Sequence, residues 1–197
     1  MIPAIYDRRS IRKFSSRPID ERDLLELMDS AAKAPSSKNS QPWKYVIVTG
    51  DSKHEMLDAY RRGLAREGTR DDCPPQWKQY LAAAAHTGDI MEQAPVTVLA
   101  VNPLGRGMDV PQTLEERVLE ICSIQSISAS IQNLLLAATD KGIGSLWICD
   151  IYFAYPELSA WLGEEGQLVA AVALGYPEES PAPRPRKPLE EILRWRR

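Results

Sequence analysis

One helical pattern, Leu114 to Ala138, constrains the fold of this 197-residue chain more than any other feature. Its apolar residues recur at helical spacing over about seven turns, and no Pro or Gly interrupts them. A helix of that length with an apolar stripe must pack along its whole face. We therefore expect this helix to be the central element of the core.

Apolar runs of strand length occur at residues 44–49, 96–101, 145–149 and 168–174. Helical patterns or long loops separate them, and no tight hairpin signal joins any two. Long crossovers favour parallel pairing wherever neighbouring strands are adjacent. The sequence therefore predicts an α+β fold, with a central, mixed and largely buried sheet covered by helices.

Local signals mark where several helices begin and end. Asp20 is placed to cap a helix that stops before Pro35, and Ser52 with Glu55 has the spacing of a capping box. Residues 76–93 and 156–162 also have helical patterns, and Gly142 begins a turn after the long helix.

Composition bounds the class of protein. Hydrophobic residues make up 44% of the chain, enough for a single domain over residues 1–197 without disulfides or metal. A net charge of -3 gives no global bias toward nucleic acid or anionic membranes. The N-terminus has no signal-peptide pattern, and we expect no later apolar stretch to be long enough to span a bilayer, so we place the protein in the cytoplasm.

The cysteines form an odd, widely spaced set at Cys73, Cys122 and Cys149. This spacing favours reduced thiols over a disulfide framework, and each is expected to act as a small core residue. For Cys149 we favour a buried, inert thiol over a redox nucleophile, because it ends an apolar strand.

Two polar segments have the chemistry of a ligand site. Residues 34–43 place amide, hydroxyl and proline groups in a glycine-free loop before a strand, and residues 7–14 gather cations and a hydroxyl. Guanidinium groups suit a phosphate better than lysine does, because they bind it bidentately. Considered one at a time, each of these arginines is better explained as part of a solvated surface cluster, and only the combined motif favours a ligand site.

The chain resembles the nitroreductase family in segments 7–43, 132–138, 142–149, 174–177 and 184–191, which follow the family's order over nearly its whole length. The resemblance implies a three-layer fold that binds FMN. It also implies a homodimer in which the extended arm at residues 177–197 embraces the partner subunit.

The resemblance also assigns the cofactor contacts. The implied flavin-binding residues are, for the phosphate and ribityl chain, Arg8, Arg9, Ser10, Arg12, Arg184 and Arg186; for the ring edge and ribityl hydroxyls, Pro35, Ser36, Ser37, Asn39 and Gln41; and, beside the reactive side of the ring, Trp147, Ile148 and Cys149.

A flavin carries the hydride chemistry itself, so this interpretation requires no catalytic acid–base pair. We accordingly expect no catalytic side chain, and His54 and His86 lack the spacing of metal ligands. Arg12 is the candidate for stabilising the reduced ring. The implied reaction passes electrons from NAD(P)H to an acceptor such as a nitroaromatic or a quinone by a ping-pong mechanism.

Two other functions remain open from the sequence. The proline-rich residues 181–186 and the basic tip at residues 194–197 could make the chain a non-enzymatic interaction module. The protein could also bind flavin without turning over. We favour the enzyme, with no nucleic-acid or membrane partner. Trp77 and Tyr80 could cover the flavin or simply pack in the fold.

Overall fold

The computed structural model describes residues 1–72, 74–108 and 110–197, so Cys73 lies outside the described residues. Its elements are, in order, α1 (Pro3–Asp7), α2 (Glu21–Ala32), η1 (Ser37–Asn39), β1 (Lys44–Val48), α3 (Gly50–Gly68), α4 (Pro75–Gln93), β2 (Val96–Asn102), α5 (Leu114–Asp140), β3 (Gly144–Ile148), η2 (Asp150–Ala154), α6 (Tyr155–Leu162), β4 (Gln167–Gly175) and α7 (Leu189–Ile192).

The strands form one sheet in the order β1-β2-β4-β3, and every neighbouring pair is antiparallel. The α+β class is confirmed, whereas the predicted mixed sheet with parallel pairing is wrong. Strands β2 and β4 are buried along their whole length. Both strands read as continuous apolar runs because helices cover both faces of the sheet. Such runs do not indicate whether neighbouring strands are parallel or antiparallel.

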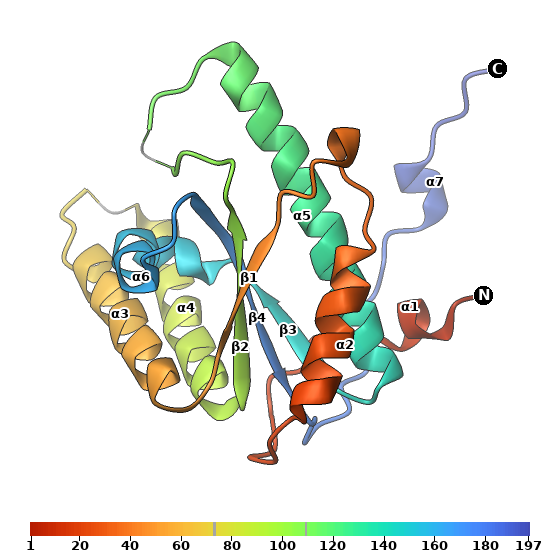
Figure 1. Ribbon diagram of the computed structural model, residues 1–197, viewed down its shortest axis with the longest axis horizontal. Coiled ribbons are helices and arrows are strands. Elements are labelled where there is room, and N and C mark those ends of the chain that lie inside the picture. The colour runs from red at the N-terminus through yellow and green to blue at the C-terminus, as the bar shows by residue number, and fades with distance from the viewer. Residues whose placement is uncertain (73, 109) are drawn as a thin grey trace.

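Helices cover both faces of the sheet, which gives three layers (Figure 1). One face packs against α3, α4, η2 and α6 around Leu57, Tyr60 and Leu158. The other face packs against α2 and α5 around Leu27 and Ile131. Alternate strand residues supply the two cores: on β2, Val98 faces the α2–α5 side and Leu99 the α3–α4 side.

The long helix α5 is a core element, as predicted. Ile127, Ile131, Leu134 and Ala138 are fully buried against the sheet and α2. Among the described helices, α5 is nevertheless long and apolar enough to cross a bilayer by length and composition. The expectation that no stretch reaches that length is therefore wrong; the apolar character of α5 reflects its position in the core.

Several helix ends follow the sequence signals and one does not. The Asp20 carboxylate accepts from the Arg22 amide at 2.8 Å, and Gly142 adopts a left-handed conformation (φ 67°) just after α5. Helix α3 instead begins at Gly50 after Thr49, so Ser52 and Glu55 lie inside it and form no capping box. A capping box does begin α5, between Thr113 and Glu116.

Candidate functional site

The N-terminal segment and the start of the C-terminal arm pair beside β3. The Ile11 amide donates to the Ser145 carbonyl of β3 at 3.0 Å. Residues 13–15 then pair with residues 176–178, through Ser15 N to Tyr176 O at 2.8 Å and Glu178 N to Lys13 O at 3.0 Å. This pairing brings arginines from the two ends of the chain together.

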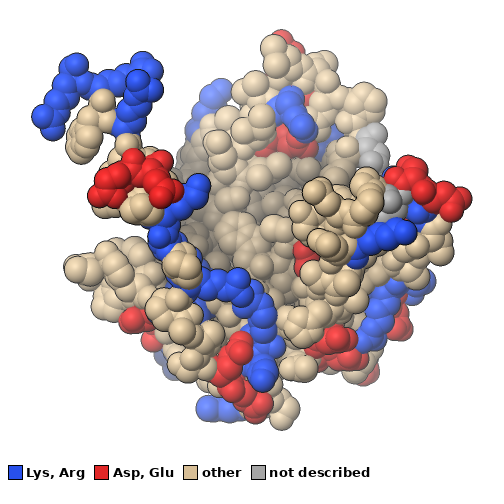
Figure 2. Space-filling model, turned by 180° about the vertical axis from the view of Figure 1, so that it is seen from behind, with Lys and Arg blue, Asp and Glu red and all other residues tan. Residues whose placement is uncertain are grey.

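Five arginines surround a cavity of about 610 Å³ at this junction. Arg8, Arg9 and Arg12 come from the N-terminal segment, and Arg184 and Arg186 come from the arm. Ser10 also lines the cavity, as predicted. Figure 2 shows basic side chains gathered where the arm passes over the body of the molecule.

None of these five guanidinium groups has an ion-pair partner among the described residues. Their recorded partners are backbone oxygens: Arg9 donates to Tyr6 O at 2.6 Å, and Arg12 donates to Ser10 O at 3.2 Å. Burial lowers the pKa of Arg8, and the charges of Arg186 and Arg9 lower it further. A cluster whose members repel one another in this way is suited to an anion.

The polar loop before β1 is held in a strained conformation. Lys38, Asn39 and Gln41 have φ values of 53°, 53° and 47°, where a residue other than glycine costs roughly 1 kcal/mol. The Ser36 hydroxyl stabilises the turn by accepting from the Gln41 amide at 3.0 Å. The Ser37 amide donates to Ser126 Oγ on α5 at 3.3 Å, which fixes the loop against that helix.

This loop borders a second cavity, of about 470 Å³. Ser37, Lys38 and Ser40 line one side of it, while Arg106 and the buried Glu120 lie on other parts of its wall. The sequence did not predict Arg106 and Glu120 as site residues, because the loop after β2 and the start of α5 carry no binding motif. The cavity shares no lining residue with the arginine cavity.

The two cavities lie at different levels along α5. Arg9 and Thr139 line one small cleft, whereas the polar loop contacts Ser126, which lies 13 residues earlier on the helix. That interval corresponds to roughly 20 Å along the helix axis. The structure therefore does not bring the polar loop and the arginines of one chain into a single pocket.

The segment predicted to lie beside the flavin ring covers the last two residues of β3 and the residue that follows it. Trp147 is half-buried, and Ile148 is 2% exposed, so only the backbone of Ile148 can reach a ligand. Cys149 is exposed, because β3 ends at Ile148, so the expectation of a buried thiol is wrong. Partial burial, followed by the charge of Asp150, raises the pKa of the Cys149 thiol and keeps it protonated near neutral pH.

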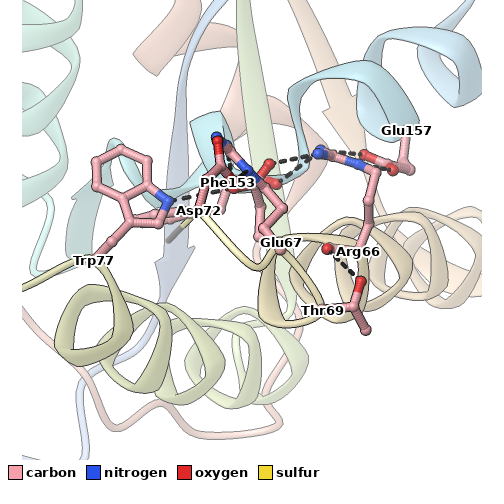
Figure 3. Close-up of polar contacts among 8 residues, drawn as sticks. Arg66, Glu67, Thr69, Asp72, Trp77, Phe153 and Glu157 are labelled. Atoms are coloured by element: carbon pink, nitrogen blue, oxygen red, sulfur yellow. Dashed lines mark hydrogen bonds and ion pairs between the residues drawn. The ribbon is translucent and has the colours of Figure 1, made fainter. Parts of the chain in front are cut away.

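A cluster of polar residues joins α3, α4 and η2 on the α3–α4 side of the sheet (Figure 3). The buried Glu67 carboxylate forms ion pairs with Arg66 and Arg70, and Trp77 Nε1 donates to it at 3.3 Å. The Trp77 ring also packs on Phe153, with centroids 4.8 Å apart. These contacts give Trp77 the packing role, and they hold η2 against the two helices.

The family model described as "Nitroreductase family" matches residues 5–176. The chain belongs to the nitroreductase family. It is therefore an oxidoreductase of that family. Within the described residues, no group of three or more His, Cys, Asp or Glu side chains is arranged to hold a metal ion.

Three relatives of this nitroreductase-family chain match it over most of its length. It is 26% identical to a nitrobenzene nitroreductase of Ectopseudomonas oleovorans, covering 89% of this chain and 86% of the relative. It is 29% identical to an NADH dehydrogenase of Thermus thermophilus, covering 98% and 94%. A BluB-like flavoprotein from Clostridium difficile is 27% identical in structure-based comparison, with a TM-score of 0.79 and coverage of 99% and 98%.

The FMN-dependent nitroreductase NfnB from Mycobacterium smegmatis, solved with NADPH, has a TM-score of 0.74 and covers 98% of this chain and 96% of its own. At 20% identity, this likeness supports the fold alone.

Proposed function

We propose that the protein binds FMN and transfers electrons from NAD(P)H to an electron-poor organic acceptor, such as a nitroaromatic or a quinone. The observation that carries this proposal is the cavity lined by five arginines, none of which has an ion-pair partner in the part of the chain that the structure describes. A dianionic phosphate would relieve their mutual repulsion and could accept bidentate hydrogen bonds from them.

The residues at the two ends of β3 fit the two ends of an FMN molecule. Ser10 lies beside Ser145 near the start of the strand, and Cys149 follows its last residue. Four residues of extended chain span roughly 13 Å, a distance that a ribityl phosphate chain with its ring can bridge. Arg8, Arg9, Arg12 and the arm would hold the phosphate, and the backbone at residues 147–149 would face the ring.

When bound, FMN would supply the hydride chemistry, by accepting a hydride from the nicotinamide and passing it to the acceptor. The chain's own contribution is to orient and to stabilise charge. In this placement Arg12 lies at the phosphate end of the site, so it would not be the cation that stabilises the reduced ring. If donor and acceptor use the same face in turn, the kinetics will be ping-pong.

The polar loop at residues 35–41 cannot meet the arginine cavity within one chain. We propose that a second copy supplies it, so that each site combines the arginines of one subunit with Ser36, Ser37, Asn39 and Gln41 of the other. Exposed apolar side chains are consistent with burial in such a homodimer; they include Leu114, Val118, Leu119 and Ile121 on the outer part of α5. The arm would then lie along the partner, in the cytoplasm.

The test is the visible spectrum of the purified protein after incubation with FMN and desalting, followed by anaerobic addition of NADH and NADPH separately. Retained flavin that bleaches supports the proposal and identifies the donor. Retained flavin that stays oxidised would leave a flavin-binding protein without this activity. Protein without retained flavin would refute the proposal.

A further inference from the structure

A short hydrogen bond ties α4 to the residue that follows Cys149. Thr87 Oγ1 and Asp150 Oδ2 are 2.6 Å apart, and Thr87 is 9% exposed. Asp150 is half-buried and begins η2. Neither residue belongs to a recognised motif, and neither is among the flavin contacts assigned above.

The Thr87 hydroxyl has one proton but two acceptors within reach. Besides Asp150, the Ala83 carbonyl lies 3.1 Å away in the preceding turn of α4. A neutral hydroxyl can donate to only one of them at a time. The shorter contact is to the Asp150 carboxylate, so Thr87 holds this side chain in one position.

The charge of Asp150 is not neutralised by a cation. Among the described residues, no Lys, Arg or His lies within ion-pair distance of Asp150. The titratable neighbours that feel its charge are Tyr60 on α3 and the Cys149 thiol. Both are neutral near pH 7, so within residues 1–72, 74–108 and 110–197 the carboxylate is a fixed negative charge without an ion-pair partner.

The rest of η2 is also clamped. Arg66 donates to the Phe153 carbonyl at 3.3 Å, Trp77 packs on the Phe153 ring, and Gly63 approaches Ala154 so closely that an added Cβ would lie 2.3 Å from its Cα. Figure 3 shows Trp77 and Arg66 converging on this turn from α4 and α3. The position of Asp150 relative to residues 147–149 is therefore fixed by the fold.

We propose that Asp150, positioned by Thr87, is the residue that holds the reduction potential of bound FMN low in this protein. The inference rests on the proposed function, because it places the ring beside residues 147–149. A fixed negative charge near the ring disfavours the gain of electron density on reduction. The reduced enzyme is thereby a stronger donor toward electron-poor acceptors.

The experiment measures the reduction potential of bound FMN by anaerobic dye-equilibrium titration in full-length wild type, Asp150→Asn, Thr87→Val and Thr87→Ser. Asp58→Asn is the matched control, because Asp58 is an exposed carboxylate on α3. We expect a more positive potential in Asp150→Asn and a smaller positive shift in Thr87→Val. Thr87→Ser keeps the hydroxyl and should match wild type, as should Asp58→Asn.

Circular dichroism and retained FMN would show that each variant is folded and loaded. A potential in Asp150→Asn equal to that of wild type would overturn the inference and leave the proposed function standing. An equal shift in Asp58→Asn would also overturn it, since the effect would then belong to net charge. Failure of wild type to retain FMN would refute the proposed function, and this inference with it.

Discussion

The carboxylate of Glu179, in the C-terminal arm, accepts a hydrogen bond from the backbone amide of Arg12 at 2.5 Å. The contact places this acid beside the arginine cavity, in a cleft that Asp7 and Arg9 also line. It also fixes the arm shortly before Arg184 and Arg186, which line the same cavity as Arg8. Glu179 is thus an anchor for the arm, and the arginines beyond it stay available to an anion.

Replacing Arg186 by Gln should weaken FMN binding about tenfold, which corresponds to one lost charge-assisted contact of about 1.4 kcal/mol. The same change should leave the melting temperature of the FMN-free protein unchanged or slightly higher, because Arg186 lowers the pKa of Arg8 by repulsion. Fluorescence titration and thermal melts check the two parts. Arg196→Gln, at the exposed tip, makes the same charge change and should alter neither; equal weakening in both variants would contradict a specific contact.

Truncating the chain after Ser180 keeps Glu179 and the pairing with residues 13–15, but removes Arg184 and Arg186. If the site is shared between subunits, this truncation should weaken both dimerisation and FMN retention. Sedimentation velocity and absorbance after desalting measure these properties. Truncation after Leu193 removes only the basic tip and serves as the control. A dimer that keeps its flavin after the longer truncation would be incompatible with a shared site.

Gly63→Ala should destabilise the protein by about 1–3 kcal/mol, because the new Cβ would lie 2.3 Å from Ala154 Cα and 2.8 Å from Glu157 Oε2. Urea unfolding measures the change. Gly68→Ala is the control on the same helix, since no atom lies within 4 Å of its added Cβ. That variant should be neutral or slightly stabilising, through reduced flexibility of the unfolded chain. Similar losses in both would show that the contact with η2 is irrelevant.

Arg66→Gln should lower stability by about 1 kcal/mol or less near pH 7, because Arg66 is partly exposed and its ion pairs are screened. Hydrogen bonding from Arg66 lowers the pKa of Glu157 below its ordinary value of 4.5. For Glu67, burial alone would raise the pKa, but hydrogen bonds from Arg66, Trp77 and Arg70 lower it overall.

A carboxylate with a lowered folded pKa contributes its stability above the unfolded pKa and loses it as the pH falls through the folded value. The difference in melting temperature between wild type and Arg66→Gln should therefore be largest at neutral pH and should shrink below about pH 4. Thermal melts from pH 3 to 8 test this. Arg22→Gln, which disrupts an exposed pair with Glu26, should show almost no difference at any pH. A difference for Arg66→Gln that widens in acid would contradict the assignment.

The position of most elements followed from periodicity, because burial leaves a local trace in the sequence. The buried stripe of α5, the Asp20 cap and the four apolar runs were all visible in this way. Strand direction could not be predicted in this way, since β2 and β4 would be apolar throughout whether their neighbours ran parallel or antiparallel.

Local sequence patterns likewise predicted only part of the candidate site. Arginines 8, 9, 12, 184 and 186 could be named from their chemistry and the family resemblance, and the structure places them around one cavity. The Thr87–Asp150 contact could not be named, because 63 residues separate its partners and neither lies in a motif. Exposure of Cys149 depended on where β3 stops, a one-residue difference that apolar patterning does not resolve.

The pairing of residues 12–15 with 176–179 sets the order of events during synthesis. The Arg12–Glu179 contact spans 167 positions, so a chain still attached to the ribosome lacks half of the arginine cavity until its last residues emerge. Cofactor capture would then be a post-translational step that follows closure of the two ends. Nascent chains would have to remain soluble, without flavin, for nearly the whole of elongation.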